Sequence, residues 1–270
     1  MPQITKVTSQ KKRKDRYNIY IDDGKGEKYA FSVDEEVLLK FNLKKGKDID
    51  EFDLADIQYY DDIQKAFTYA LNYLSHRMRS ELEIRSYLKK KEIDDPIIQE
   101  AVYKLYNYKY LDDLAFAQAF VRTQINGGNK GPLTIKLELK EKGINEKIIE
   151  QALLQYPFEI QEEHARKLAE KSIAKEKGIS ERALKQKLEQ TLLRKGFSME
   201  AITESLQNVS LEKGDDEEWY SLCHQAEKAH RRLQKYTGFE YEQRMKQALF
   251  RKGFPIDSIE RYLAEKKELS

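Results

Sequence analysis

Leu139-Lys140-Glu141-Lys142-Gly143-Ile144 is the stretch that decides the fold, because three related strings stand elsewhere in the chain. The four strings begin at Leu88, Leu139, Leu192 and Leu249, so that successive copies lie 51, 53 and 57 residues apart. They align without gaps, and an isoleucine follows each leading leucine at the same distance, at Ile98, Ile149, Ile202 and Ile259. Chance does not produce four such copies, and self-similarity at this period is typical of helical-repeat proteins.

Each string has the composition of a helix end followed by a turn. Its lysines and arginines complement the partial negative charge at the carboxyl end of a helix. Gly143, Gly196 and Gly253 stand where a helix end favours a residue in the left-handed conformation. The first copy has Glu92 at this position instead. Residues suited to cap the next helix follow the four strings, and these are Asp94, Asn145, Ser198 and Asp257.

Two helices are expected before each turn, a longer one and a middle one. In the first repeat the middle helix opens with the capping box Ser80-Glu81-Leu82-Glu83. Its counterpart 51 residues later is Gly131-Pro132, which also favours a helix start. Three helices per repeat and four repeats are therefore predicted. The repeats are expected at residues 61–110, 111–156, 157–210 and 211–270.

The size of one repeat has a consequence for the whole fold. A unit of about 50 residues buries little apolar surface by itself. Stacking of successive units would complete their cores and produce an elongated, curved rod. The sequence therefore predicts a mainly α-helical fold of tandem three-helix repeats, preceded by a small β-rich domain. A rod of this kind favours a long ligand.

Residues 1–60 are expected to form the β-rich domain, because β-branched and aromatic residues gather there in short runs. The runs cover residues 4–8, 17–21 and 29–33. Asp22-Asp23-Gly24-Lys25-Gly26 separates the second run from the third and is a turn signal of the hairpin kind. An antiparallel hairpin is therefore predicted at this point.

The remainder of this N-terminal part contains a short helix and a basic string. The helix is predicted from Asp34 to Phe41, with Asp34 or Ser32 as its cap. A helical period is expected from Asp61 onward. The basic string Lys11-Lys12-Arg13-Lys14 has two interpretations, a solvated loop or a loop that contacts phosphate.

The charge balance limits how the protein can bind a charged partner. Charged residues make up 36% of the chain, but 49 lysines and arginines against 47 acids leave a net charge of only +2. Electrostatic binding would therefore require the two signs to gather on different faces. No apolar run approaches 18 residues, no signal peptide is recognised, and the single Cys223 fits a reducing compartment. A cytoplasmic protein without a membrane partner is expected.

No pattern of residues for catalysis or metal binding is found in the sequence. The four histidines, His76, His164, His224 and His230, are scattered and lack metal-ligand spacing. Gly127-Gly128-Asn129-Lys130-Gly131 lacks the Gly-Lys-Ser/Thr ending of a phosphate-binding loop. No nucleophile, base and orienting group can be assembled. The protein is expected not to be an enzyme and to use no cofactor or metal ion.

One segment resembles the signature of a known family. It runs through Tyr110-Leu111-Asp112-Asp113-Leu114-Ala115-Phe116-Ala117, Phe120-Val121-Arg122, Lys130-Gly131-Pro132, Ile135, Glu138-Leu139 and Lys142-Gly143-Ile144. This pattern is similar to that of the RecX family, whose members regulate the RecA recombinase. The resemblance is best over residues 64–155, the repeat extends it to the carboxyl end, and the N-terminal strands resemble the extension of Gram-positive members. Lys109 and Thr134 depart from the family pattern, in which glycine and a basic residue are usual.

The resemblance implies a mechanism and a set of partners. The rod would lie in the helical groove of the RecA filament on single-stranded DNA and bridge several subunits. It would thereby hinder ATP turnover, filament growth, strand exchange and the coprotease activity of the filament. The implied partners are the RecA nucleoprotein filament and, through it, single-stranded DNA, with the protein itself a monomer.

Seven basic side chains on and around the middle helices are candidate contacts with an acidic filament surface or with DNA phosphates. They are Arg77, Arg79, Arg85, Lys89, Arg122, Lys130 and Lys136. The alternative is a solvated helix face whose charges complement the helix ends. Four tyrosines, Tyr103, Tyr106, Tyr108 and Tyr110, suggest base stacking, although packing between repeats is the simpler interpretation. The rival functions are direct nucleic-acid binding and a scaffold for an acidic protein.

Overall fold

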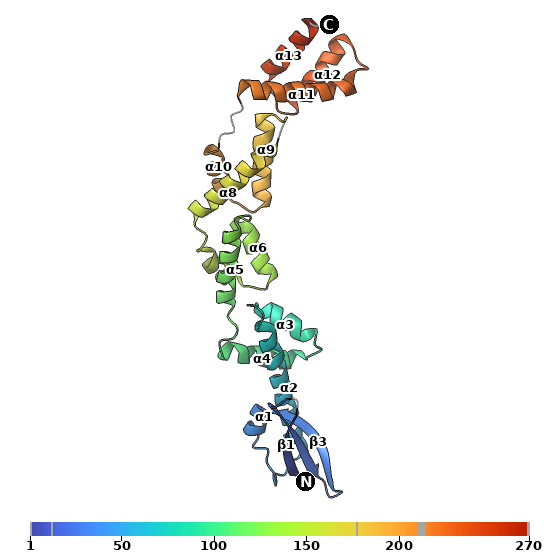
Figure 1. Ribbon diagram of the computed structural model, residues 1–270, viewed down its shortest axis with the longest axis vertical. Helices are drawn as coiled ribbons and strands as arrows, with labels where there is room; N and C mark the ends of the chain where they lie inside the picture. Colours follow the sequence, from blue (N-terminus) through green and yellow to red (C-terminus); the bar gives the residue numbers. More distant parts are fainter. Residues whose placement is uncertain (1, 12, 177, 210–213, 269–270) are drawn as a thin grey trace. The chain divides into compact units, whose positions relative to one another are not determined.

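The structure, a computed structural model, describes residues 2–11, 13–176, 178–209 and 214–268. The chain divides into two compact units. The first unit comprises Met1–Ala117 with Glu141–Ile148, and the second comprises Gln118–Lys140 with Ile149–Ser270. A small sheet and a series of helices make up the described residues (Figure 1). Lys12, part of the predicted basic string, lies outside the described residues.

The N-terminal sheet has the strands that the sequence predicts. It contains β1 (Gln3–Ser9), β2 (Arg16–Asp22) and β3 (Glu27–Asp34), all antiparallel and in this order. The predicted hairpin between β2 and β3 is confirmed, because Asp22 Oδ1 accepts hydrogen bonds from the backbone N–H groups of Gly24 (2.8 Å) and Gly26 (3.0 Å). A carboxylate thus holds the tight turn closed.

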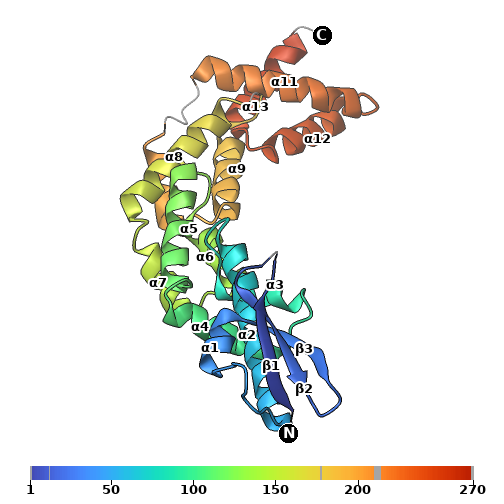
Figure 2. The same ribbon diagram turned by 60° about the horizontal axis from the view of Figure 1, so that its bottom comes forward.

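The predicted short helix is also confirmed, and a much longer helix follows it. Helix α1 (Glu35–Lys40) is capped by Asp34, whose side chain accepts from the N–H of Glu36. Helix α2 (Glu51–Leu74) begins with a capping box between Asp50 and Asp53. In Figure 2 the sheet lies along α2.

The start of α2 corrects one expectation. The helical period begins at Glu51 rather than at Asp61, so Asp61 lies in the middle of a helix. The early start is explained by packing: the first half of α2 places Ile57 in the core beneath the sheet, and the second half places Phe67 in the core of the first repeat. One helix therefore serves both cores. The proposed five-domain division of the chain stays a prediction.

The helices that follow form triplets of a long, a middle and a third helix. The first triplet is α2 with α3 (Glu81–Lys89) and α4 (Asp95–Asn107). The later helices are α5 (Asp113–Gly127), α6 (Pro132–Glu141), α7 (Glu146–Leu153), α8 (Phe158–Ile173), α9 (Glu181–Arg194), α10 (Met199–Gln207), α11 (Asp215–Leu233), α12 (Gly238–Phe250) and α13 (Ile256–Glu268). The mainly α-helical fold of three-helix repeats with a small N-terminal sheet is confirmed.

The repeated string ends the middle helix of each triplet, as predicted. The four leading leucines are buried. Gly143, Gly196 and Gly253 have φ values of +79°, +84° and +88°, which is the left-handed conformation. Glu92 takes the same conformation, with φ of +60°, although it is not glycine. The turn geometry is therefore kept in the one copy that lacks the favoured residue.

The caps of the helices agree with the sequence in part, since Asp94 occupies the cap position of α4 but its side chain makes no capping hydrogen bond. Ser80 and Glu83 form the predicted capping box of α3, and Ser198 caps α10. Asn145 Oδ1 accepts from the N–H of Ile148 in the first turn of α7. Asp257 was expected to cap the last helix, but α13 begins at Ile256, so Asp257 lies inside its first turn.

A recurring contact, called here the repeat joint, links one middle helix to the turn of the next triplet. In the second unit, the N–H of Gly131 donates to the carbonyl of Lys195 (2.7 Å), and the N–H of Leu133 donates to the carbonyl of Gly196 (3.0 Å). The hydroxyl of Thr134 donates to the same Lys195 carbonyl (2.9 Å). The free N–H groups at the start of α6 thus meet the free carbonyls of the turn after α9.

The same joint occurs twice more, once in each unit. In the second unit, Ser180 at the start of α9 donates to the carbonyl of Lys252 (2.5 Å), and Gly253 lies against it. In the first unit, Gly143 lies against Leu82 at the start of α3. A joint therefore needs glycine in the turn because another backbone or side chain approaches it closely.

Candidate functional site

Of the seven predicted cations, Arg85, Lys89 and Lys136 lie on middle helices, and Arg77, Arg79 and Lys130 lie in the turns just before them. Arg122 lies on α5, the long helix of its triplet. Four of them, Arg77, Arg79, Arg85 and Lys89, belong to the first unit. The other three, Arg122, Lys130 and Lys136, belong to the second unit. Each group has to be judged by its own surroundings, because a cation that is already neutralised has less charge to offer a partner.

Arg77 lies in the turn before α3 and is paired with Glu83. Its Nη2 lies 2.8 Å from Glu83 Oε1, and Lys142 Nζ lies 3.6 Å from the same oxygen. Burial acts to raise the pKa of Glu83, but hydrogen bonds from Arg77 and from the Ser80 N–H, with the charge of Lys142, bring the pKa below its ordinary value. Arg77 therefore supports the capping box of α3 and, through Lys142, the joint in the first unit.

Arg79 lies on a pair of stacked aromatic rings. Its guanidinium carbon is 4.0 Å from the ring centroid of Tyr73. The rings of Tyr73 and Tyr87 are stacked, with centroids 4.2 Å apart and planes at 11°. The Nε of Arg79 is buried and has no hydrogen-bond partner among the described residues. This cation is held by its stacking contact rather than by an acid.

Arg85 and Lys89 stand one turn apart on α3, and each has a polar partner. Arg85 Nε lies 2.6 Å from Glu81 Oε1, and its Nη2 donates to Gln99 Oε1 at 2.6 Å. Lys89 forms an exposed ion pair with Asp95 at 3.0 Å. These contacts fit the alternative interpretation, in which the charges balance each other on a solvated face.

The tyrosines at the end of α4 are placed mainly by packing. Tyr108 and Tyr110 lie against the ring of Phe67, with centroids 5.8 and 6.3 Å away. The hydroxyl of Tyr106 donates to Glu81 Oε2 at 2.8 Å. Burial and this hydrogen bond raise the pKa of Tyr106. Packing within the first unit therefore accounts for three of the four tyrosines that suggested base stacking.

In the second unit, Arg122 and Lys130 also have partners. Arg122 Nη1 donates to Gln155 Oε1 at 3.3 Å. Lys130 Nζ lies 2.5 Å from Glu138 Oε1, and the Lys130 carbonyl accepts from the hydroxyl of buried Tyr156. Lys136 lies on α6 and is half-buried. Within the second unit these cations gather around the start of α6.

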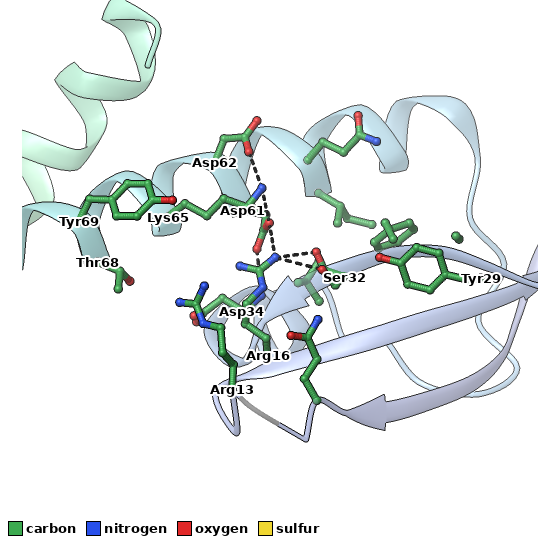
Figure 3. Close-up of a pocket in the computed structure, with 16 residues that line it drawn as sticks. Arg13, Arg16, Tyr29, Ser32, Asp34, Asp61, Asp62, Lys65, Thr68 and Tyr69 are labelled. Carbon is green, nitrogen blue, oxygen red and sulfur yellow. Dashed lines mark hydrogen bonds and ion pairs between the residues drawn. The ribbon is translucent and has the colours of Figure 1, made fainter. Parts of the chain in front are cut away.

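A polar cleft of about 640 Å³ lies between β3 and α2 in the first unit (Figure 3). At its floor Arg16 Nη2 lies 2.8 Å from both Asp61 Oδ2 and the carbonyl of Ser32. Lys65 pairs with Asp61 (3.0 Å) and Asp62 (2.8 Å). Asp61 Oδ1 also accepts from the N–H of Asp34. The contacts of Arg16, Asp61 and the Asp34 backbone therefore fasten the sheet to α2 at the floor of this cleft.

A set of cations that the sequence analysis did not single out lies on α11 in the second unit. Lys228, Arg231, Arg232 and Lys235 are exposed, and none of them takes part in an ion pair or hydrogen bond within the described residues. A signal for them was present in the sequence, because residues 228–239 contain no acid. This signal lies outside the middle helices, since α11 is the long helix of its triplet.

Within the part of the chain that the structure describes, no helix is both long enough and apolar enough to cross a membrane. The described histidines, cysteine and acids form no group of three or more that could hold a metal ion.

Comparison with known protein families gives matches along most of the chain. The model of the "Regulatory protein RecX N-terminal domain" matches residues 2–50. Models of the first and second RecX three-helix domains match residues 66–105 and 112–153. The model of the third three-helix domain matches twice, at residues 159–206 and 215–263. The third and fourth triplets are thus similar to the same family domain.

Individual relatives cover nearly the whole chain. The chain is 48% identical to the regulatory protein RecX of Bacillus licheniformis over 266 residues, which is 98% of this chain and 100% of the relative. It is 45% identical to that of Bacillus subtilis over 267 residues, with 99% and 100% coverage. A crystal structure of regulatory protein RecX matches 77% of this chain and all of its own, with a TM-score of 0.71 and 40% identity. Another, from Lactobacillus salivarius, matches 57% of this chain and 99% of its own, with a TM-score of 0.54 and 38% identity. The chain belongs to the RecX family of regulatory proteins.

Proposed function

We propose that this protein inhibits the RecA recombinase in the cytoplasm by binding in the groove of RecA filaments on single-stranded DNA. The observation that carries the proposal is the relationship to regulatory RecX proteins over nearly the full length of the chain. Inhibition would extend to ATP turnover, strand exchange and coprotease activity, since all three need an intact filament. The protein would act by binding, without a reaction of its own.

The recurring repeat joint supports this proposal. Successive triplets that meet at equivalent positions offer a series of similar surfaces. A filament also repeats the same surface from subunit to subunit, so several weak contacts could act together. Linked contacts of this kind bind far more tightly than any one of them alone.

We also propose that the seven cations of the middle helices take part in this binding. The pair of Lys89 with Asp95 is exposed on both sides and that of Arg77 with Glu83 is half-exposed, and exposed pairs contribute only about 0–1 kcal/mol. A partner that offers a phosphate or a bidentate carboxylate could therefore replace Glu83 as the partner of Arg77, or Asp95 as the partner of Lys89, at small cost. Arg79, which pairs with no acid, would keep its stacking contact.

The test is an assay of RecA with the purified full-length protein at comparable concentrations. DNA-dependent ATP hydrolysis and strand exchange are expected to fall as the protein is added. Unchanged rates of both reactions would overturn the proposal. Substitution of Arg122 and Lys130 by alanine is expected to weaken the inhibition, and unchanged inhibition would remove these two residues from the set of contacts.

Direct binding to nucleic acid is the second candidate function, favoured by the unpaired cations of α11. It predicts tight binding to naked DNA with a steep dependence on salt. Binding to RecA filaments that is much stronger than binding to naked DNA would decide for the first function. A scaffold that binds an acidic protein surface would bind its partner in a pulldown without DNA. This result would distinguish it from filament binding and from direct binding to nucleic acid.

A further inference from the structure

Helix α11 has two faces of opposite character. Leu222, Ala226 and Ala229 are buried in the core of the last triplet. The side turned to solvent carries Lys228, Arg231, Arg232 and, in the turn just after the helix, Lys235. Their spacing of i, i+3, i+4 and i+7 places them on one side of the helix. These four residues are called the cation face below.

The four cations of the cation face lack the ion pairs that several other cations of the second unit form. Arg166, Lys167, Lys187 and Lys246 are all paired with glutamates, at 2.5–2.8 Å. No described ion pair or hydrogen bond involves a member of the cation face. Glu227 stands just before the group and lines the same cleft as Arg231 and Glu242, but it forms no described ion pair with any of the four cations. Because the whole chain has a net charge of only +2, four cations without an ion pair are a local excess of positive charge.

Part of this excess has a structural use. Arg231 and Arg232 lie in the last turn of α11, where cations complement the helix dipole. Lys228 lies outside that turn, and Lys235 lies beyond the end of the helix. The dipole therefore does not account for the whole group.

Aromatic rings lie at both ends of the cation face. Tyr220, about two turns before Lys228, is 71% exposed. Its ring is parallel to that of His224, with planes at 3° and centroids 6.5 Å apart. At the other end, Tyr236 has the guanidinium of Arg244 at 4.0 Å from its ring centroid and the ammonium of Lys235 at 5.1 Å. Aromatic rings beside cations are the combination that binds single strands, since bases stack on the rings and phosphates meet the cations.

We propose that the cation face binds the phosphate backbone of single-stranded nucleic acid, with Tyr220 and Tyr236 as stacking surfaces for bases. An acidic protein segment would also be attracted by the four charges, but it would make no use of the exposed ring of Tyr220 or of the partly buried ring of Tyr236. The inference deepens the proposed function, because the strand would be the DNA of the RecA filament. Only this identification of the strand rests on the proposed function.

The experiment measures binding of the full-length protein to a fluorescein-labelled oligothymidylate by fluorescence anisotropy over a range of salt concentrations. The variant Lys228→Gln/Arg231→Gln/Arg232→Gln/Lys235→Gln is expected to bind at least about tenfold more weakly. Each phosphate contact in a single strand contributes about 0.7 to the slope of log K against log salt, so the slope should fall by about 3.

A matched control removes the same charge from elsewhere in the second unit. It is Arg166→Gln/Lys167→Gln/Lys187→Gln/Lys246→Gln, in which each lost cation had a glutamate partner. This variant should keep most of the affinity and most of the slope. An equal loss in both variants would overturn the proposal, because net charge alone would then explain the binding.

Two further variants address the fold and the rings. Arg231→Lys/Arg232→Lys keeps the charges and should keep the binding, so a loss of binding there would also contradict a role for phosphate contact. Tyr220→Ala/Tyr236→Ala should weaken oligothymidylate binding severalfold without changing the salt slope. Circular dichroism of each variant identifies any that fail to fold, and for these the single substitution Lys228→Gln is measured instead.

The remaining outcomes separate this proposal from its alternatives. The variant Lys228→Gln/Arg231→Gln/Arg232→Gln/Lys235→Gln could keep its affinity for DNA and lose binding to polyglutamate. That result would overturn the proposal in favour of an acidic protein partner. Full inhibition of RecA by a variant that no longer binds oligothymidylate would overturn only the assignment of the strand to the filament. Loss of both activities would support the whole inference.

Discussion

At the scale of single residues, the glycine position of the repeated string has two structural requirements, a left-handed backbone and space for a close contact. Gly143, Gly196 and Gly253 have a left-handed backbone and also touch the preceding middle helix. A Cβ at Gly143 would lie 2.7 Å from the Cβ of Leu82. Glu92 belongs to the first triplet, where no earlier middle helix exists to press on the turn. At Glu92 only the left-handed backbone is required, which explains how a glutamate can occupy the position.

This reasoning predicts that Glu92→Gly stabilises the protein. A non-glycine residue in the left-handed region costs about 1–2 kcal/mol, while a glycine loses about 0.5–1 kcal/mol more in chain entropy. The free energy of unfolding should therefore rise by up to about 1 kcal/mol in urea titrations. Lys109, with φ of +59°, should behave in the same way when replaced by glycine. Gly143→Ala is the opposite case and should destabilise; stabilisation by that substitution would contradict the argument.

A second residue, His164, makes stability depend on pH. Its Nδ1 lies 2.9 Å from the hydroxyl of buried Tyr156. Burial lowers the pKa of His164 below its ordinary 6.5, an effect that the nearby Glu163 opposes. Below about pH 6.5 the unfolded chain therefore binds a proton more readily than the folded one, so the free energy of unfolding should fall as the pH falls. Urea titrations at pH 7.5 and 5.5 measure this difference.

The variant His164→Gln should lose this part of the pH dependence. The exposed His76, replaced by glutamine in the same way, controls for removal of a histidine as such. If both variants kept the difference between the two pH values, the burial of His164 would not be its source.

At the scale of elements, the ion pair between Arg16 and Asp61 fastens the sheet to α2. Their side chains are only 8% and 4% exposed. Removal of one partner leaves the other charge buried, which typically costs about 3–5 kcal/mol. Arg16→Ala should lower the free energy of unfolding of the first unit by that amount. Arg77→Ala, which breaks a half-exposed pair with Glu83, should cost about 1 kcal/mol or less. Equal losses would contradict the anchoring role.

The elements also show what the sequence can and cannot reveal. Helix ends, turns and the hairpin were predicted, because their signals lie within a few residues, as in the capping box of Ser80. The start of α2 was missed, since its first half follows the core of the sheet rather than the helical repeat. The Arg16–Asp61 anchor joins residues 45 apart in the chain and leaves no local signal. The repeat joint also joins residues far apart in the chain. Its glycines were predicted only as left-handed residues at helix ends.

The candidate site was less predictable than the fold. The sequence identified basic residues on the middle helices, but it could not show that Arg77, Arg85 and Lys130 have acidic neighbours. Neutralisation depends on which side chains meet in space. For the cation face of α11, the acid-free run of residues 228–239 is visible in the sequence, but only the fold shows that its cations are exposed and form no ion pair.

At the scale of the whole molecule, the sequence predicts that stacking of triplets produces an extended body, and this stays a prediction. Small-angle X-ray scattering of the free protein measures it. A compact chain of 270 residues would have a radius of gyration of about 18 Å. The repeat prediction requires a clearly larger value. A value near that of a compact chain would refute stacking along the full chain.

The repeat joint gives a way to test whether coupling between triplets matters for function. A Cβ at Gly196 would lie 2.4 Å from the backbone nitrogen of Thr134, so Gly196→Ala must push the start of α6 away from the turn after α9. If inhibition of RecA requires triplets held in fixed relation, this variant should need about tenfold more protein for the same inhibition, or about 1.4 kcal/mol. Gly238→Ala is the matched control, because Gly238 also has a left-handed φ, of +56°, but has nothing within 4 Å of an added Cβ. Helical content from circular dichroism should stay the same in both variants. Equal inhibition by the two would mean that the triplets bind the filament independently and that the joint serves stability alone.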